Sequence, residues 1–306
     1  MTARRVLVTG ASGFLGEAVR HSLEAAGAEP VATDARPAPG VRAVDVCDPD
    51  QLDAVLDGVD AVVHLAAMGV SDQGLVAGAD ADPARAVRVN VEGFVHVVQA
   101  AARHGVRRVV WSSSTTVYGP AAGYGPAPID EAAPLRPTTA YGVTKAACEH
   151  MGAVLSARLG LPVVSLRLPM VYGPDRWYGG SQKPLVDLTE ALRTGGPATV
   201  QAWAGDADWI HVADAADALA QLALGDAAQP AYHVVGHRGG LAELAGALVT
   251  AAGAPASAVV ETVPGGAPDI PAIDDAALRR DTGFTPRFPD AASGAASYLT
   301  PERTTS

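Results

Sequence analysis

The sequence predicts an α/β protein built on a doubly wound parallel sheet, followed by a smaller and less regular α/β lobe. Over the first two-thirds of the chain, short β-branched runs alternate with longer stretches rich in Ala and Leu. The strand candidates are continuous apolar runs, which is typical of strands covered on both faces. Strands and helices in alternation form right-handed crossover units, and these units place the strands parallel to one another.

The elements of this first part follow from the two patterns. The strand candidates are Val6–Val8, Pro30–Thr33, Val41–Val46, Ala61–Leu65, Arg108–Trp111 and Val163–Leu168. The helix candidates between them are Leu15–Ala26, Pro49–Leu56, Val91–His104 and Tyr141–Leu159.

The pattern loosens from Pro169 onward, where loops rich in Gly and Pro are expected at Tyr172–Pro184, Gly195–Pro197 and Gly265–Pro271. Further strands are expected at Thr199–Trp203 and Tyr232–Val235, and further helices at Val212–Leu224 and Leu241–Ala252. The polar tail after Leu299 is expected to fray.

Composition excludes several classes of protein. The chain has 306 residues, of which 48% are hydrophobic and 18% charged, so it can bury a large core. Its net charge of −11 does not indicate the basic surface that binds nucleic acid or an anionic membrane. No apolar run reaches the length of a membrane span, and the first one is too short for a secretion signal. We therefore expect a cytoplasmic enzyme.

Metal and disulfide chemistry are not expected either. The cysteines, Cys47 and Cys148, lie far apart and have no metal-type spacing. His233 and His237 lie four residues apart but span a strand end, so they are not interpreted as a metal site.

A glycine-rich segment joins the first strand to the first helix. Gly10 permits a tight turn, Gly13 lets backbone N–H groups approach a pyrophosphate, and Gly16 lets the helix pack close to the strand. The helix N-terminus adds partial positive charge beside the phosphates. The spacing G-x-x-G-x-x-G departs from the standard fingerprint, but the strand before it and the helix after it favour dinucleotide binding over a plain turn.

Acidic residues follow the next two strands. Asp34 lies where a carboxylate accepts hydrogen bonds from the adenosine ribose and repels a 2′-phosphate. This position favours NAD over NADP, although Arg36 is close enough to hold a phosphate, and an ordinary loop aspartate is the alternative. Asp45 and Val46 are expected beside the adenine, with a turn-forming Asp45 as the alternative.

Tyr141 and Lys145 lie one turn apart on one face of the last long helix of this part. A phenol has a pKa of about 10, which makes it a poor base at neutral pH. We expect the Lys145 ammonium to favour the phenolate and so to lower the pKa of Tyr141. Tyr141 can then take a proton from a substrate hydroxyl or return one to a ketone. A surface pair of side chains is the alternative.

A run of hydroxyl residues, Ser112–Gly119, follows the strand Arg108–Trp111 and emerges at the same sheet edge as the glycine segment. Doubly wound sheets bind ligands at this edge, so a hydroxyl here can hold the substrate oxygen next to Tyr141. Capping or turn formation is the better interpretation for most of these hydroxyls.

Together these motifs resemble the extended short-chain dehydrogenase/reductase superfamily, and within it the NAD-dependent epimerase/dehydratase branch. The resemblance covers nearly the whole chain. It rests on Thr9–Gly16, His64–Ala67, Asp82-Pro83 with Asn90–Gly93, Ser112–Gly119, Tyr141–Lys145, Leu166–Pro174 and Asp208–Asp214. We expect a Rossmann-type domain over residues 1–168 plus about 205–237, and a substrate-binding lobe over about 169–204 and 238–306.

The resemblance implies the role of each site residue. Tyr141 is the implied acid/base, Lys145 binds the nicotinamide ribose and tunes Tyr141, and Ser114 is the implied catalytic hydroxyl. NAD carries the hydride while the protein positions it. The residues implied in NAD binding are Gly10, Gly13, Phe14, Leu15, Gly16, Asp34, Asp45, Val46, Leu65, Ala66, Ala67, Asn90, Tyr141, Lys145 and Pro169. His64 and Tyr118 are interpreted as packing residues.

Departures from the family pattern narrow the substrate. Thr115 and Thr116 stand where dehydratases of the family carry an Asp-Glu pair, so sugar 4,6-dehydration is not expected. Met170 replaces the usual Asn of nucleotide-sugar epimerases and Ala207 their usual Arg, which removes groups that bind a diphosphate. We therefore expect a smaller substrate: a free sugar, a polyol or hydroxy acid, or a non-sugar secondary alcohol or ketone.

The residues expected to face this substrate are Ser114, Met170, Arg176 and Lys183. Arg176 and Lys183 can bind a carboxylate, and solvated loop charges are an equal alternative. The resemblance also implies a homodimer formed by the helices Val91–His104 and Tyr141–Leu159. The second helix carries an apolar stripe of Cys148, Met151, Val154 and Leu155, which an ordinary core helix shows too.

The sequence leaves three functions open. The first is an NAD-dependent oxidoreductase that interconverts a secondary alcohol and a ketone on a small molecule. The second is a nucleotide-sugar 4-epimerase with tightly bound NAD, and the third is a non-catalytic NAD(H)-binding regulatory protein. The intact set of Ser114, Tyr141 and Lys145 favours an enzyme.

Overall fold

The computed structural model describes residues 3–68, 74–194, 199–227, 229–254 and 259–298. The predicted loop Gly195–Pro197 and the tail after Leu299 lie outside the described residues. Within the described residues, no helix is long and apolar enough to cross a bilayer.

The predicted doubly wound parallel sheet is confirmed. Its strands are β1 (Arg5–Thr9), β2 (Glu29–Asp34), β3 (Arg42–Ala43), β4 (Ala61–His64), β5 (Arg108–Ser114), β6 (Val163–Leu168) and β10 (Ala231–His233). They lie in the order β10-β6-β5-β4-β1-β2-β3, and every neighbouring pair is parallel. The chain thus starts in the middle of the sheet and extends it in both directions, which creates a crevice beside β1.

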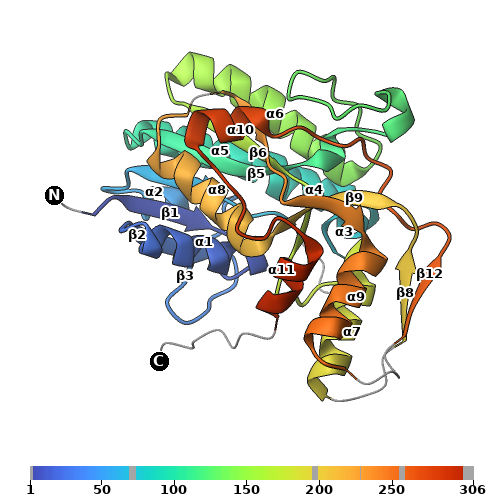
Figure 1. Cartoon of the computed structure of the whole chain (residues 1–306). Helices are drawn as coiled ribbons and strands as arrows, with labels where there is room; N and C mark the ends of the chain where they lie inside the picture. Colours follow the sequence, from blue (N-terminus) through green and yellow to red (C-terminus); the bar gives the residue numbers. More distant parts are fainter. Residues whose placement is uncertain (1–2, 69–73, 195–198, 228, 255–258, 299–306) are drawn as a thin grey trace.

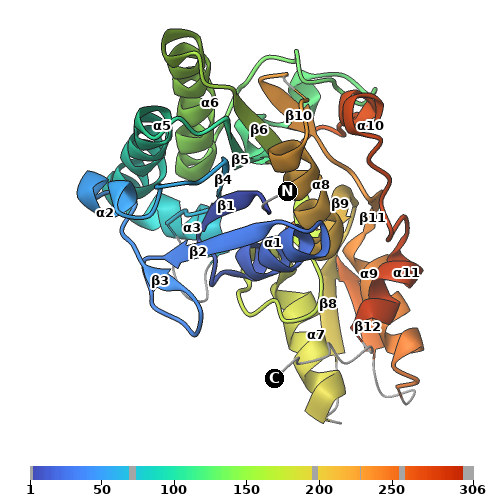
Figure 2. The ribbon, with the colours of Figure 1, turned by 90° about the vertical axis from the view of Figure 1, so that its left-hand side faces the viewer.

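Helices cover both faces of this sheet, as the continuous apolar strands predict (Figure 2). On one side are α2 (Pro49–Asp53), α5 (Gly93–Arg103) and α6 (Ala140–Leu159); on the other are α1 (Phe14–Ala25) and α8 (Val212–Leu224). Successive side chains of β1 point to opposite faces of the sheet, so they contribute to two separate parts of the core. Val6 and Val8 pack with α1 and α8, whereas Leu7 packs with α2, α5 and α6.

The chain after β6 adds two small sheets and several helices, most of which gather to one side of the main sheet (Figure 1). The helix at Ala276–Thr282 instead packs beside β10. The strands β7 (Met170–Tyr172), β9 (Asp206–His211) and β11 (His237–Gly240) form one sheet, and β8 (Thr199–Trp203) pairs with β12 (Val259–Val263). The helices are α7 (Lys183–Thr194), α9 (Leu241–Ala251), α10 (Ala276–Thr282) and α11 (Ala291–Ser297). The predicted division of the chain into two functional parts stays a prediction.

Some elements differ from the sequence prediction. The predicted strand Val41–Val46 is reduced to β3, because Asp45 takes the following amides out of the strand pairing. Its backbone N donates to Gln51 Oε1 at 2.9 Å, and its carboxylate accepts from the N of Cys47 at 2.9 Å. Before α5 lie α3 (Gly74–Ala81), α4 (Pro83–Ala86) and a π-helical stretch, Val87–Glu92, none of which was predicted in this form.

Candidate active site

A cleft of about 1740 Å³ opens at the carboxyl ends of the parallel strands. Its walls come from the β1–α1 loop, the ends of β2, β4, β5 and β6, the first turn of α6 and the segments beyond β6. The predicted residues that line it are Gly10, Gly13, Phe14, Leu15, Gly16, Asp34, Asp45, Val46, Leu65, Ala66, Ala67, Ser114, Tyr141, Pro169, Met170 and Arg176. Asn90, Lys145 and Lys183 lie outside this lining.

The β1–α1 loop approaches the cleft with its backbone. Gly10 has a φ of +73°, and a Cβ on it would lie 2.8 Å from the backbone N of Ala66. A Cβ on Gly16 would collide with the carbonyl oxygen of Gly10. The N-cap of α1 is Gly13, which has no side chain to occupy the first N–H groups of the helix. This arrangement fits a pyrophosphate bound at the helix N-terminus.

Two acidic side chains, Asp34 and Asp45, line the cleft near the ends of β2 and β3. The Asp34 carboxylate accepts hydrogen bonds from the backbone N of Ser12 at 3.2 Å and of Arg36 at 3.0 Å. The Arg36 guanidinium lies over the ring of Trp177, 5.9 Å from its centroid. Asp45 performs the turn-forming role that was its alternative interpretation, while it still lines the cleft.

Ser114 ends β5 and caps the short turn Thr115–Val117. Its Oγ accepts hydrogen bonds from the backbone N of Thr116 at 3.2 Å and from the Thr116 hydroxyl at 3.0 Å. With both acceptor positions used, the Ser114 O–H is left to donate to an oxygen in the cleft.

Tyr141 lies in the first turn of α6, which Thr139 caps by accepting a hydrogen bond from the N of Gly142 at 3.1 Å. Burial raises the pKa of Tyr141, and the neighbouring Tyr178 adds to the rise. The expected lowering by Lys145 is not what this structure shows. The Lys145 ammonium lies over the ring of Tyr141, 5.5 Å from its centroid, so desolvation of the phenol dominates.

Lys145 lies beneath the cleft, one turn from Tyr141. Its Nζ donates to the carbonyl oxygen of Ser112 at 2.7 Å and lies 5.4 Å from the centroid of the Trp111 ring. Burial lowers the pKa of Lys145 to about 8. The structure therefore brings Ser114, Tyr141 and Lys145 together at the ends of adjacent elements.

Asn90 lies behind the residues that line the cleft and is buried there. Its amide oxygen accepts from the backbone N of Met68 at 2.7 Å, and its amide nitrogen donates to Thr144 Oγ1 at 3.0 Å. Asn90 thus joins the segment after β4 to α6, and the residues before Met68 line the cleft in its place.

The predicted substrate residues divide into two groups. Met170 and Arg176 line the cleft, as does Ala207. Lys183 instead pairs with the Asp187 carboxylate at 2.8 Å on the exposed face of α7, which is the solvated alternative.

Arg176 is half-buried, and no acidic side chain among the described residues pairs with it. Its guanidinium lies 3.8 Å from the centroid of the Tyr178 ring and 5.7 Å from that of Phe14. Its N–H groups donate to the carbonyl oxygens of Val171 at 2.8 Å and Tyr178 at 3.2 Å. Burial lowers the pKa of Arg176, and the neighbouring Tyr178 and Tyr298 act in the opposite direction.

His64 and Tyr118, interpreted as packing residues, are both buried and hydrogen-bonded. His64 Nδ1 lies 2.8 Å from Thr9 Oγ1, and burial lowers the pKa of His64 to about 3. Tyr118 OH lies 2.7 Å from His233 Nε2, and Tyr118 also lines the cleft.

The sequence interpretation missed Tyr178 and Glu149. Tyr178 lies in a loop without periodicity, so no pattern pointed to it. Glu149 lies on α6 one turn after Lys145, and this i, i+4 spacing is a signal that the sequence offers.

Comparison with known proteins identifies the class. The model of the "NAD dependent epimerase/dehydratase family" matches residues 6–235. A dTDP-glucose 4,6-dehydratase of Streptomyces niveus is 30% identical over 92% of this chain and 88% of its own length. A uronate dehydrogenase of Pseudomonas syringae is 34% identical over 54% of this chain and 58% of its own length. The structure of Thermus thermophilus UDP-glucose 4-epimerase with NAD has a TM-score of 0.79 and 25% identity, and covers 97% of this chain and 99% of that protein.

The chain therefore belongs to the NAD-dependent epimerase/dehydratase family, as its motifs indicated. It is an enzyme of the extended short-chain dehydrogenase/reductase type, and NAD is the cofactor of its family. This finding sets aside the non-catalytic alternative. The similar proteins include a dehydratase, an epimerase and a dehydrogenase, so the family alone leaves the substrate undetermined.

Proposed function

We propose that the protein is an NAD-dependent dehydrogenase that interconverts a secondary alcohol and a ketone on a small, non-nucleotide substrate. One observation carries this proposal. Ser114 and Tyr141 line the same cleft as the glycine loop, and Lys145 lies directly beneath them.

The chemistry that NAD supplies when bound is acceptance of a hydride from the carbon that bears the hydroxyl. The Ser114 hydroxyl donates a hydrogen bond to the substrate oxygen and fixes its direction. Tyr141 exchanges a proton with that oxygen, and Lys145 favours the phenolate when a proton is withdrawn. Because burial raises the pKa of Tyr141, the phenol of the free protein is set to donate a proton to a carbonyl oxygen.

The residues proposed to hold NAD are those that line the cleft. The N-terminal end of α1 and the loop before it bind the pyrophosphate, and Asp34 binds the adenosine ribose. The proposed set is Gly10, Gly13, Phe14, Leu15, Gly16, Asp34, Asp45, Val46, Leu65, Ala66, Ala67, Tyr141 and Pro169. Lys145, beneath the lining, completes the set, and Asn90 supports the wall from behind.

The substrate end of the cleft supports a small molecule. Thr115 and Thr116 line it where a dehydratase would need acids, and Met170 and Ala207 line it where a diphosphate would need polar donors. Asp208 also lines this end of the cleft, and its Oδ1 lies 3.0 Å from Nη1 of Arg238. The Arg238 charge is therefore already paired and is not available to bind a diphosphate. These groups favour a compact hydroxylated substrate over a nucleotide sugar.

Arg176 supports a carboxylate on that substrate. A half-buried guanidinium that lines the cleft and has no acidic partner can bind an anion that enters the cleft. A hydroxy acid or a sugar acid therefore fits the cleft better than a neutral polyol of the same size.

The test is a substrate panel read by NADH absorbance. Uronic acids, aldonic acids, 3-hydroxy acids, polyols and free sugars are incubated with NAD, and the proposal expects NADH formation with at least one acid. Arg176→Ala, compared with Arg193→Ala on the exposed side of α7 as the matched control, should raise the KM for that acid. Turnover of nucleotide sugars alone would contradict the proposal.

A nucleotide-sugar 4-epimerase is the second candidate, because the Thermus thermophilus UDP-glucose 4-epimerase structure covers almost the whole chain. An epimerase releases no net NADH, and it retains its nucleotide through purification. Release of NAD from denatured protein, together with interconversion of UDP-sugars without a change in absorbance, would support this candidate.

We propose a homodimer that uses an exposed face of α6. The predicted stripe divides in two: Cys148 and Leu155 are buried in the core, whereas Met151 and Val154 are 40% and 51% exposed. Val143, about two turns before Met151 on α6, is 52% exposed. A second copy would cover these side chains. A cytoplasmic location stays a prediction of the sequence.

A further inference from the structure

We propose that Glu149 is a positioning residue, which fixes Ser114 relative to Tyr141 and Lys145. The inference rests on the proposed function, since it concerns the same three residues. Tyr141, Lys145 and Glu149 follow one another at single-turn spacing on one face of α6. Each of the last two reaches a different residue of β5.

The two contacts with β5 are consecutive along the strand. Lys145 Nζ donates to the carbonyl oxygen of Ser112 at 2.7 Å, and the Ser113 hydroxyl donates to Glu149 Oε1 at 2.6 Å. The next residue is Ser114. A shift of α6 along β5 would break both contacts, so together they fix where Tyr141 lies relative to the Ser114 hydroxyl.

A buried ion pair fixes Glu149 in turn. Arg167 lies on β6 directly opposite Ser113 in the strand pairing. Its Nε donates to Glu149 Oε1 at 3.0 Å and its Nη2 to Oε2 at 2.6 Å, and both side chains are less than a tenth exposed. A pair that is buried and bidentate holds its geometry closely. Glu149 therefore ties β5, β6 and α6 to one another.

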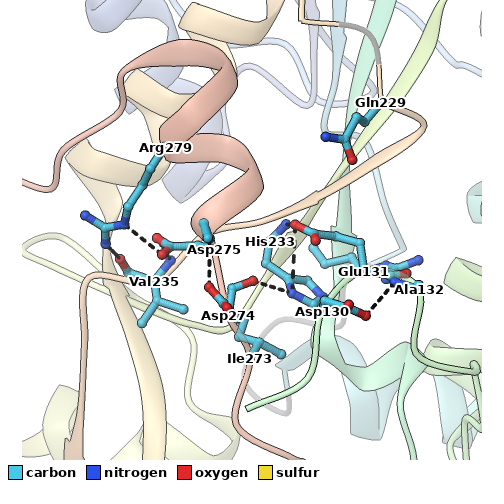
Figure 3. A network of polar contacts seen from close by, with 12 residues as sticks. Asp130, Glu131, Ala132, Gln229, His233, Val235, Ile273, Asp274, Asp275 and Arg279 are labelled. Carbon is cyan, nitrogen blue, oxygen red and sulfur yellow. Dashed lines mark hydrogen bonds and ion pairs between the residues drawn. The ribbon is translucent and has the colours of Figure 1, made fainter.

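The segment after Ser114 is anchored to the same guanidinium. Arg167 Nη1 donates to Tyr118 OH, and Tyr118 OH lies 2.7 Å from His233 Nε2. His233 lies in turn 2.9 Å from the carbonyl oxygen of Asp274 through its Nδ1, and its backbone N donates to Glu131 Oε1 at 2.8 Å (Figure 3). Ser114 is thus held between two anchored neighbours, Ser113 before it and Tyr118 after it.

The charge of Glu149 also acts on Lys145. Burial lowers the pKa of Lys145, and this is the largest effect. Cys148 and the Glu149 carboxylate, both on the same helix, raise the pKa of Lys145 and so partly offset the burial. The other titratable groups near the ammonium are Tyr141, in the preceding turn, and His64 on β4, whose imidazole burial keeps neutral. The facing strand β5 offers the Trp111 ring and the Ser112 carbonyl.

The first arm of the test is kinetic and uses the alcohol that the panel identifies. Glu149→Gln should lower kcat by about 10- to 100-fold and Ser113→Ala by about tenfold, because misplaced reacting groups lose rate, while the affinity for NAD is unchanged. The matched control is Asp214→Asn. Asp214 is buried on α8 and accepts from the backbone N of Arg287 and Phe288 at 3.0 Å, so this variant should lose thermal stability and keep kcat.

The second arm needs no substrate, so it still tests Glu149 if the proposed function fails. The chain has only two lysines, Lys145 and Lys183, so protein labelled with ¹³C at lysine Cε gives two NMR signals. The Lys145 signal should titrate near 8 in the wild type. Glu149→Gln should lower this midpoint, because an opposite charge is lost. Ser113→Ala should raise it, because a loosened contact admits water. The exposed Lys183 is the internal reference.

These results separate the possible outcomes. Opposite shifts of the Lys145 midpoint, with a fall in kcat where a substrate is known, support the proposal. If Glu149→Gln does not fold, Ser113→Ala, which leaves the ion pair intact, decides alone. Glu149 would be a purely structural residue if both variants matched Asp214→Asn, with lower thermal stability but a wild-type kcat and an unmoved Lys145 midpoint.

Discussion

Burial and the neighbouring Tyr178 and Cys148 all raise the pKa of Tyr141. The sequence spacing alone suggested that Lys145 would lower the pKa of Tyr141. The structure instead removes the phenol from water and places the ammonium over the ring, so the pKa of Tyr141 is raised. Residue spacing along a helix predicts which side chains meet, but it does not predict how much water they lose.

Tyr141→Phe should lower kcat by about 10²- to 10⁴-fold, because it removes the group that exchanges a proton with the substrate oxygen. The dissociation constant for NAD should change little, which fluorescence titration can check. Tyr124→Phe is the matched control, because Tyr124 is outside the cleft and bonds to the carbonyl oxygen of Pro134. Wild-type turnover in Tyr141→Phe would refute the acid/base role.

Asp34→Ala should weaken NAD binding by about tenfold or more, since a hydrogen bond to a charged group contributes about 1.5–3 kcal/mol. It should also reduce the preference for NAD over NADP, because the carboxylate that repels a 2′-phosphate is lost. Titration of both nucleotides against the wild type and the variant measures this ratio. A wild-type protein that prefers NADP would show the assignment to be mistaken.

The sequence could predict those site residues whose positions follow from the ends of the parallel strands. These are the glycines of the β1–α1 loop, Asp34 at the end of β2 and Ser114 at the end of β5. Asn90 and Lys183 could not be placed in this way. Their positions depend on partners from distant segments, Met68 and Thr144 for Asn90, and on the local ion pair with Asp187 for Lys183.

At the scale of elements, long apolar segments were predictable and short polar ones were not. The strands Val163–Leu168 and Thr199–Trp203 and the helix Val212–Leu224 have the predicted bounds. The strand β9 was missed because two aspartates interrupt its apolar residues, and its pairing with β7 and β11 supplies the order that its pattern lacks. The helix α7 was missed because Gly and Pro residues before it suggested a loop.

The exposed face of α6 leads to a prediction about assembly. Replacing both Met151 and Val154 with Glu should convert a dimer into a monomer, because charges would be buried between the two copies. Light scattering coupled to size-exclusion chromatography measures the mass. Arg193→Glu, at an exposed position of α7 away from this face, is the control. A wild-type protein that is monomeric at micromolar concentration would exclude this interface.

At the scale of the whole molecule, the cleft is built from segments that lie far apart along the chain. The glycine loop lies on one wall, and Arg176 and Tyr178, from beyond β6, lie against Phe14, the first residue of α1 after that loop. A dinucleotide in this cleft would contact both walls. Its binding therefore stabilises the whole fold, since a ligand stabilises the state to which it binds.

NAD at 100 times its dissociation constant should stabilise the protein by about 2.7 kcal/mol, which corresponds to several degrees in Tm. Differential scanning fluorimetry measures the shift, with NADP and AMP at the same concentration for comparison. The shift with NAD should be the largest of the three. A Tm that does not respond to NAD would contradict the assignment of the cleft.

The edge strand β10 has a consequence for how such enzymes can change. It comes from a late part of the chain, yet it completes the main sheet beside β6, and α8 from the same part covers α1. The polypeptide that shapes the substrate end of the cleft also finishes the scaffold that would carry the coenzyme. A foreign C-terminal module spliced after β6 would have to supply its own edge strand and covering helix, or the recipient sheet would be left with an open edge. Substitution at positions such as Met170 and Ala207 changes the substrate end of the cleft and leaves that scaffold intact.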